Sequence, residues 1–262
     1  MPSTAPQSDT QWGVVTGSSR GIGRAIALEL AADGFPLLLH GRDQAALEDV
    51  RRQVVDLGNS CEIFCAALEQ PAERALLVER AWACGRVAAW INNAGADVLT
   101  GDLAPLSFDE KLHQLWQVDV AATIDLCRRV GQKMKQAGHG VILNMGWDQA
   151  ETGMEGDSGE MFAAAKGAVM AFSRSAAKSL APEVRVNCLA PGWIGTGWSE
   201  EASPYWQRRA KAESLSGRWG APSDIAQVAR FLVSPDANFI NGQIISINGG
   251  FAGSVEPNVE SK

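Results

Sequence analysis

The sequence predicts an α/β fold: one doubly wound domain whose parallel sheet of about seven strands carries helices on both faces. Short apolar runs alternate with longer amphipathic stretches along almost the whole chain. Strands that alternate with helices of about 10–15 residues are typical of parallel sheets. The 262 residues contain no internal repeat, low-complexity tract or linker that would divide such a domain. We expect it over residues 11–252, between loose polar tails at 1–10 and 253–262.

Helix-ending and helix-starting residues support the element boundaries. Gly34 and Gly58 follow the first two helices, where the left-handed residue that ends a helix is usually glycine. Pro71 suits the first turn of the third helix, and Ser107 with Glu110 forms the pattern of a capping box before the fourth. The expected strands lie at residues 13–16, 36–40, 63–66, 87–91, 141–144, 184–188 and 243–247, and the expected helices at 21–33, 44–57, 71–84, 107–134, 161–180 and 223–233.

Composition excludes several classes of protein. The chain is 46% apolar with a net charge of −7, and it has no dense run of Lys and Arg, so no nucleic-acid partner is expected. No apolar run approaches the roughly 18 residues of a membrane span, and the first residues lack the apolar core of a signal peptide. The 5 cysteines are odd in number and form no C-x-x-C pair. Reduced thiols and a cytoplasmic location are therefore expected.

A glycine-rich turn joins the first strand to the first helix. Residues 16–23 read TGSSRGIG, which spaces the glycines as G-x-x-x-G-x-G. Glycines let the backbone approach phosphate groups, and the N-terminus of the following helix offers unpaired N–H groups to an anion. The turn therefore indicates a nucleotide-binding loop. The alternative is a tight strand–helix turn without a ligand.

Further segments make the chain resemble the short-chain dehydrogenase/reductase family over about residues 12–252. They are Asn92-Asn93-Ala94-Gly95, Pro191-Gly192 with Thr196, GRWGAPSDIA at 217–226, Asn241-Gly242-Gln243 and Asn248-Gly249-Gly250. The resemblance is nearest to the 3-oxoacyl-[acyl-carrier-protein] reductase branch. It implies a Rossmann-type fold, a nicotinamide cofactor and oxidoreductase activity on a carbonyl or hydroxyl group. The cofactor-binding residues it implies are Gly17, Ser19, Arg20, Gly21, Ile22, Gly23, Gly41, Arg42, Asn93, Ala94, Gly95, Lys166, Pro191, Gly192, Ile194 and Thr196.

The end of the second strand favours NADP(H) over NAD(H). An acidic residue there accepts a hydrogen bond from the adenosine ribose of NAD, whereas arginine suits the 2′-phosphate of NADP. The strand ends His40-Gly41-Arg42, with Gly41 at the position of the acid. Arg20 and Arg42 are the candidates for holding a 2′-phosphate by paired hydrogen bonds. The alternative is that both arginines are solvated surface residues.

The catalytic pattern implied by the resemblance is mostly missing. Family reductases use a Tyr as proton donor, a Lys four residues later, a Ser that orients the carbonyl and an Asn in a proton relay. Only Lys166 matches, because Phe162 stands at the Tyr position, Trp147 at the Ser position and Asp119 at the Asn position. The chain's single tyrosine, Tyr205, lies far along the sequence. We expect the usual mechanism to be crippled, since a lost proton donor costs about 10²–10⁴ in rate.

An acidic stretch follows the fifth strand. It carries Asp148, Glu151, Glu155, Asp157 and Glu160. Asp148 is a possible substitute acid, since a carboxyl group kept neutral by burial can donate a proton. The alternative is a solvated loop. No metal site is expected, because the carboxylates do not match a calcium loop and the 3 histidines are scattered.

Aromatic residues gather in the segment that the resemblance makes a substrate lid, about residues 192–216. They are Trp193, Trp198, Tyr205 and Trp206. They indicate an apolar or flat small-molecule substrate or a partner surface; alternatively they pack the lid against the body. The resemblance also implies a homo-oligomer, a dimer or tetramer.

Two functions stay open from the sequence. One is a divergent NADP(H)-dependent oxidoreductase whose proton comes from Asp148, Glu160, Asp119 or a water held by Lys166. The other is a non-catalytic NADP(H)-binding protein that acts as a regulator or partner subunit. A scaffold that has also lost the cofactor is a third, less favoured by the intact glycine loop.

Overall fold

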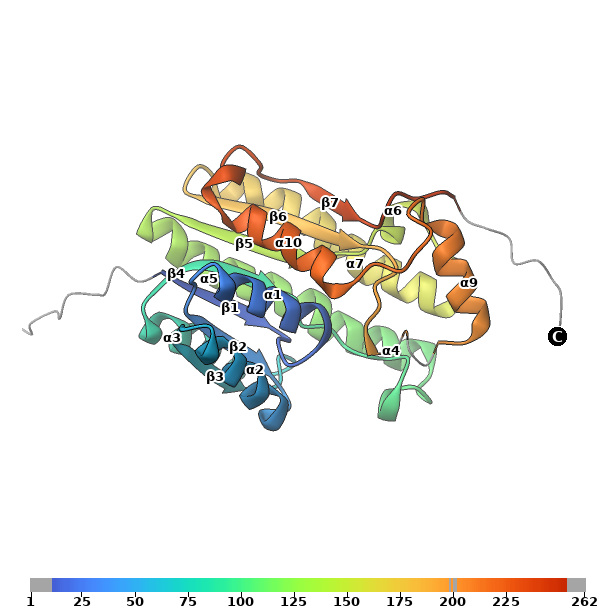
Figure 1. The fold of residues 1–262 in the computed structure, drawn as a ribbon, viewed down its shortest axis with the longest axis horizontal. Coiled ribbons are helices and arrows are strands. Elements are labelled where there is room, and N and C mark those ends of the chain that lie inside the picture. The colour runs from blue at the N-terminus through green and yellow to red at the C-terminus, as the bar shows by residue number, and fades with distance from the viewer. Residues whose placement is uncertain (1–10, 198, 200–201, 254–262) are drawn as a thin grey trace, which may run out of the picture.

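The computed structural model describes residues 11–197, 199 and 202–253 (Figure 1). The tails expected at 1–10 and 253–262 lie outside the described residues except for Gly253, as does Trp198. Seven parallel strands form one sheet in the order β3-β2-β1-β4-β5-β6-β7. The order reverses between β1 and β4, which makes the sheet doubly wound and confirms the expected fold class.

All the expected strands and helices are present. The strands are β1 (Gln11–Thr16), β2 (Leu37–Gly41), β3 (Cys61–Cys65), β4 (Arg86–Asn92), β5 (Gly140–Met145), β6 (Val184–Pro191) and β7 (Ile244–Ile247). The helices are α1 (Gly21–Ala32), α2 (Gln44–Asp56), α3 (Pro71–Cys84), α4 (Phe108–Leu115), α5 (Ala122–Ala137), α6 (Gln149–Thr152), α7 (Gly156–Leu180), α9 (Pro204–Glu213) and α10 (Pro222–Val233).

Two apolar layers hold the helices against the sheet. Helices α1, α2 and α10 cover one face, and α3, α5 and α7 cover the other (Figure 1). Because both faces are covered, the central strands are apolar without alternation, as in Leu37–Leu39 of β2, where every residue is buried. The sheet's carboxyl-terminal edge is left for loops, and ligands bind at this edge in open α/β sheets.

Three boundaries differ from the sequence-based expectation. The helix expected at 107–134 is split into α4 and α5 by a π-helical turn, Trp116–Ala121, although Ser107 and Glu110 do form the expected capping box. Helix α7 begins at Gly156 rather than 161, and α6 occupies part of the stretch expected to be a loop. Helix α9, within the lid segment, was not expected, because the polar PYWQRRAKAE shows no clear apolar stripe.

Candidate functional site

The glycine loop between β1 and α1 has the backbone geometry of a phosphate cradle. Gly17 and Gly21 have φ angles of 64° and 55°, in the left-handed region that favours glycine. A Cβ on Gly23 would lie 2.2 Å from the Gly17 carbonyl oxygen. The Asn93 side chain donates to the carbonyls of Thr16 and Gly17 at 3.0 and 3.1 Å, which fixes the loop from the β4 side.

The loop borders a cleft of about 620 Å³ at the carboxyl-terminal edge of the sheet, here called the glycine-loop cleft. No side chain caps the start of α1, whose first residues Gly21, Ile22 and Gly23 line this cleft. A glycine cradle, an open helix N-terminus and a cleft of this size fit a dinucleotide. The cleft brings together these residues expected from the sequence: Gly17, Ser19, Arg20, Gly21, Ile22, Gly23, Gly41, Arg42, Asn93, Ala94, Gly95 and Thr196.

Other expected residues lie outside the lining of the glycine-loop cleft, namely Lys166, Pro191, Gly192 and Ile194. Conversely, the cleft is lined by residues that sequence reasoning did not name for cofactor binding: His40, Ala66, Leu68, Glu69, Ala96, Asp97, Thr100, Val118 and Gly197. Their position in the sequence could have identified most of them, because most lie at or just after the ends of β2, β3 and β4, where ligands bind in such sheets.

The end of β2 carries a buried, neutral imidazole beside an exposed cation. His40 is 2% exposed, and burial lowers its pKa to about 4. Arg42 is exposed. Across the cleft, Arg20 is also exposed, with its Nη2 atom 3.9 Å from Asp97 Oδ2. A pair this long and this exposed holds the guanidinium weakly, so both arginines are available to an anion.

A buried ion pair joins Lys166 of α7 to the π-helical turn. The Lys166 Nζ atom lies 2.7 Å from Asp119 Oδ2 and donates to the Met145 carbonyl at 3.3 Å. The other Asp119 oxygen accepts from the Ala96 N–H at 2.8 Å, and the residue is 2% exposed. π-Helical turns are frequent at functional sites. Here the turn brings a carboxylate directly onto the lysine.

Two aromatic residues are close in sequence to the residues of this site: Trp147 follows Met145 by two positions, and Phe162 precedes Lys166 by four. Trp147 and Phe162 meet edge to face, with ring centroids 6.3 Å apart and planes at 65°. Both side chains are half-buried. Neither has an acidic proton to donate to a substrate oxygen, so neither can perform the proton transfer of a hydroxyl group.

The acidic stretch divides into residues with different roles. Asp148 is 8% exposed, accepts from Asn248 Nδ2 at 3.0 Å and from the Gln149 N–H, and its pKa is raised by burial. Glu151 pairs with Arg174 at 3.1 Å on the surface, and Glu160 is exposed. Glu155 reaches Arg209 of α9. Of the expected acids, Asp148 alone is both buried and shifted toward its neutral form.

The lid aromatics pack on one another. Trp193 lies 5.5 Å from Trp206 and 5.8 Å from Trp219, and Trp206 lies 4.9 Å from Tyr205, as ring centroids. The Tyr205 hydroxyl accepts from Arg209 Nη1 at 3.0 Å. These contacts favour the alternative in which the aromatic residues pack the lid against the body, since Trp193 meets Trp219 outside residues 192–216.

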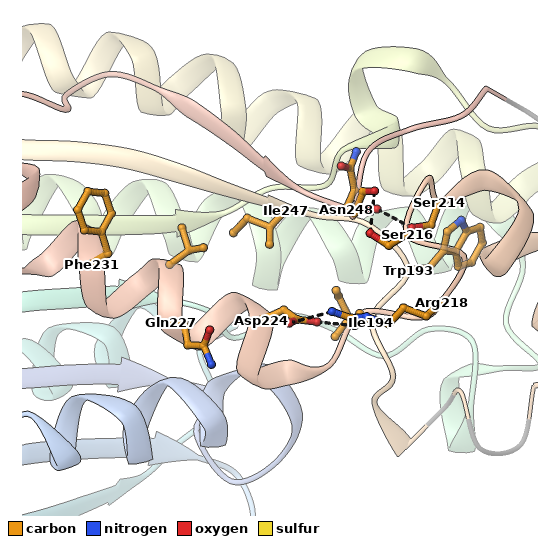
Figure 2. Close-up of a pocket in the computed structure, with 13 residues that line it drawn as sticks. Trp193, Ile194, Ser214, Ser216, Arg218, Asp224, Gln227, Phe231, Ile247 and Asn248 are labelled. Atoms are coloured by element: carbon orange, nitrogen blue, oxygen red, sulfur yellow. Dashed lines mark hydrogen bonds and ion pairs between the residues drawn. The ribbon is translucent and has the colours of Figure 1, made fainter.

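A second cavity, of about 450 Å³, lies between α10 and the end of β7 (Figure 2). Ile194, Ile247 and Phe231 supply apolar lining. Among its lining residues, Arg218 and Asp224 form an ion pair, with the Arg218 Nη1 atom 2.8 Å from Asp224 Oδ2. The Arg218–Asp224 pair thus differs from the cations of the glycine-loop cleft, where Arg20 is held only by a long, exposed contact with Asp97.

Three further observations concern the described residues alone. They contain no cluster of three or more His, Cys, Asp or Glu residues with metal-binding placement. None of their helices is long and apolar enough to cross a membrane. The cysteines, all of which fall in this part of the chain, are free thiols.

The family model for "Enoyl-(Acyl carrier protein) reductase" matches residues 16–252. The 3-oxoacyl-[acyl-carrier-protein] reductase FabG of Escherichia coli is 32% identical over 241 residues, covering 90% of this chain and 95% of that protein. The corresponding Haemophilus influenzae protein is 30% identical over 238 residues, covering 90% and 96%.

A 3-oxoacyl-(acyl-carrier-protein) reductase from Agrobacterium tumefaciens, solved with NADP bound, superposes with a TM-score of 0.83 at 28% identity. The match covers 92% of this chain and 94% of that chain. A 7α-hydroxysteroid dehydrogenase complexed with NADH and 7-oxo glycochenodeoxycholic acid gives a TM-score of 0.84 at 26% identity, covering 93% and 94%. The chain belongs to the short-chain dehydrogenase/reductase family of oxidoreductases and is similar to the 3-oxoacyl-[acyl-carrier-protein] reductases within it.

Proposed function

We propose that this protein is an NADP(H)-dependent oxidoreductase that interconverts a carbonyl and a hydroxyl group on a small molecule. The observation that carries the proposal is the glycine-loop cleft, where glycines crowd against the backbone at the N-terminus of α1. A similar reductase is solved with NADP bound. When bound, the cofactor supplies or accepts the hydride; the chain's own residues bind, orient and manage the proton.

The preference for NADP(H) follows from the charges at the end of β2. Arg42 and Arg20 are exposed residues of the cleft lining, and no acid stands at Gly41 to accept from a free ribose hydroxyl. Arginine binds phosphate through paired hydrogen bonds, which makes both residues suitable for a 2′-phosphate. The cradle residues Gly17, Gly21 and Gly23 would hold the pyrophosphate.

The proton passes through Lys166 in this proposal, because the Tyr and Ser of the family pattern are replaced by Phe162 and Trp147. Two partners of the ammonium group are the Asp119 carboxylate and the Met145 carbonyl. Its third N–H is then free for a substrate oxygen or for a water that relays the proton. Asp119 orients the lysine, because its Oδ2 atom lies 2.7 Å from the Lys166 Nζ atom.

The substrate and assembly are proposed at the level of chemical class. Trp147 and Phe162 are half-buried and pack edge to face, and their ring surface suits an apolar or flat substrate. Family membership supports a homo-oligomer, and the free thiols are consistent with a reducing cytoplasm.

The test is a titration with NADPH and with NADH at one ionic strength, read from quenching of the 9 tryptophans, followed by a screen of carbonyl and alcohol substrates. We expect tighter binding of NADPH and NADPH-dependent turnover of at least one substrate. Equal affinity for NADH would overturn the cofactor assignment. Tight NADPH binding with no turnover across the screen would count against catalysis.

A further inference from the structure

Arg209 is the most heavily engaged side chain of α9. It is buried, with 5% of its side chain exposed. Its Nε atom donates to Glu213 Oε1 at 2.8 Å, and its Nη2 atom donates to Glu155 Oε2 at 2.9 Å. Its Nη1 atom donates to the other Glu155 oxygen and to the Tyr205 hydroxyl, while the guanidinium carbon lies 5.4 Å from the Trp206 ring centroid.

These contacts divide into those within α9 and those that leave it. Glu213, Tyr205 and Trp206 belong to α9 itself and would move with Arg209. Glu155 is the exception, because it precedes α7 in the segment between β5 and that helix. The bidentate pair between Glu155 and Arg209 therefore links α9 to the segment before α7, through two residues 54 positions apart in the chain.

The carboxyl-terminal end of α9 is anchored separately. Glu213, with 1% of its side chain exposed, accepts from Gln149 Nε2 at 3.2 Å and from Trp193 Nε1 at 2.8 Å. Its backbone carbonyl accepts from the Ala252 N–H at 2.8 Å. Because Gln149 is buried, Trp193 is partly buried and Ala252 bonds through its backbone, we take this end as the fixed point of the helix.

Glu155 has the local structure of a releasable partner. It occupies the N-cap position of α7, yet its side chain does not cap that helix. Gly153 and Gly156, with φ angles of 84° and 85°, flank the turn that presents it to Arg209. Its side chain is 67% exposed, so it regains water without a large desolvation cost when the pair breaks.

We propose that the Glu155–Arg209 pair is a latch that holds α9 closed against the segment 148–160, with the Glu213 end of the helix as the hinge. The assignment of α9 to the substrate lid rests on the proposed function. In this proposal, opening the latch separates α9 from the segment 148–160, which lies between Trp147 and Phe162 in the sequence, and admits substrate. The latch is set by this chain's own charges and is closed without a ligand.

The experiment is hydrogen exchange of the cofactor-free protein, measured by mass spectrometry on peptides that cover α9. The test variant is Glu155→Gln, which keeps the side-chain size and removes the charge. Glu151→Gln is the matched control, because Glu151 lies in the same segment but pairs with Arg174 of α7. We expect amides in the first half of α9 to exchange about fivefold faster in Glu155→Gln, as the loss of a partly exposed pair predicts. The Glu151→Gln protein should match the wild type in α9.

Three outcomes would overturn the latch: unchanged α9 exchange in Glu155→Gln, equal acceleration in Glu151→Gln, or acceleration spread evenly over α9 and the sheet. A parallel NADPH titration separates this proposal from the proposed function. All three proteins should bind NADPH equally. If none binds it, the proposed function fails, while the exchange data still decide whether the latch exists.

Discussion

The two parts of the sheet's carboxyl-terminal edge differ in what forms them: backbone and glycines in one, long side chains in the other. Near β1, β2 and β4, the glycine-loop cleft is shaped mainly by backbone and by glycines that leave no room for a side chain. Near β5 and β6, the site consists of long side chains that bind one another, as in the Lys166–Asp119 pair and the Glu155–Arg209 latch. The first part is specified by short motifs, whereas the second depends on partners far apart in the chain.

The two kinds of construction respond differently to substitution. The cradle tolerates few substitutions at Gly17 and Gly23, because an added Cβ there would lie 2.8 Å from the Ala94 Cα atom and 2.2 Å from the Gly17 carbonyl oxygen, respectively. A site of side chains can exchange its parts so long as buried charges stay paired. The comparison therefore predicts that changes in the side-chain region act first on stability, and changes in the cradle act first on cofactor affinity.

The largest effect should come from Lys166→Met. This substitution leaves the Asp119 carboxylate, 2% exposed, without its cation. Breaking one side of a buried ion pair costs about 3–5 kcal/mol, so the free energy of unfolding should fall by that amount in denaturant titrations. Lys178→Met, at an exposed position of the same helix, is the control. If both variants unfold alike, the Lys166–Asp119 pair is not a buried one in solution.

Gly23→Ala tests the glycine loop and should lower its affinity for NADPH. Its Cβ would lie 2.2 Å from the Gly17 carbonyl oxygen and 2.4 Å from Asn93 Nδ2, so the loop must move. We expect NADPH affinity to fall about 100-fold or more, equivalent to about 2.7 kcal/mol, in the fluorescence titration. Gly167→Ala is the matched control, because a Cβ there meets no atom within 4 Å. Unchanged affinity in Gly23→Ala would remove the cradle from the proposed cofactor site.

The same contrast decides what the sequence could predict. Every strand and its order along the chain followed from apolar runs and turn residues, because those signals are local. The glycine loop followed from its local spacing of glycines, whereas Gly41, Arg42 and Asn93–Gly95 were candidates through the family resemblance. Their grouping into one cleft rests on strand ends that meet at one edge of a parallel sheet.

The parts that sequence reasoning missed depend on distant partners. The π-helical turn at Trp116–Ala121 places Asp119 against Lys166 and the Ala96 N–H, and neither contact is visible from helical periodicity. Helix α9 is too polar to show an apolar stripe, since several of its residues serve the Arg209 contacts. The acidic stretch looked like a solvated loop, yet Asp148 and Glu155 are bound to residues from other elements.

The pH dependence of the free energy of unfolding tests the burial of His40 in the lining of the glycine-loop cleft. The pKa of His40 is lowered from 6.5 to about 4 by burial, so the unfolded chain takes up the proton more readily than the folded one. The contribution of neutral His40 is complete above pH 6.5 and is lost as the pH falls toward 4. By pH 5 the loss should amount to about 2 kcal/mol. His40→Leu should therefore flatten the decline in the free energy of unfolding between pH 6.5 and 5, while His113→Leu, at an exposed position, should leave it unchanged.

The smallest effect is expected for the removal of one exposed arginine from the glycine-loop cleft. Arg42→Leu removes one exposed cation from the lining without touching the cradle. We expect NADPH affinity to fall about tenfold, since a charge-assisted bond to phosphate is worth about 1.4 kcal/mol or more, while NADH affinity stays the same. Arg52→Leu, an exposed arginine that pairs with Asp49 on the outer side of α2, is the control. The 2′-phosphate is the chemical difference between the two cofactors. An equal loss of affinity for NADPH and NADH would therefore assign Arg42 to the part of the dinucleotide that they share. Selectivity for NADPH would then rest on Arg20 alone.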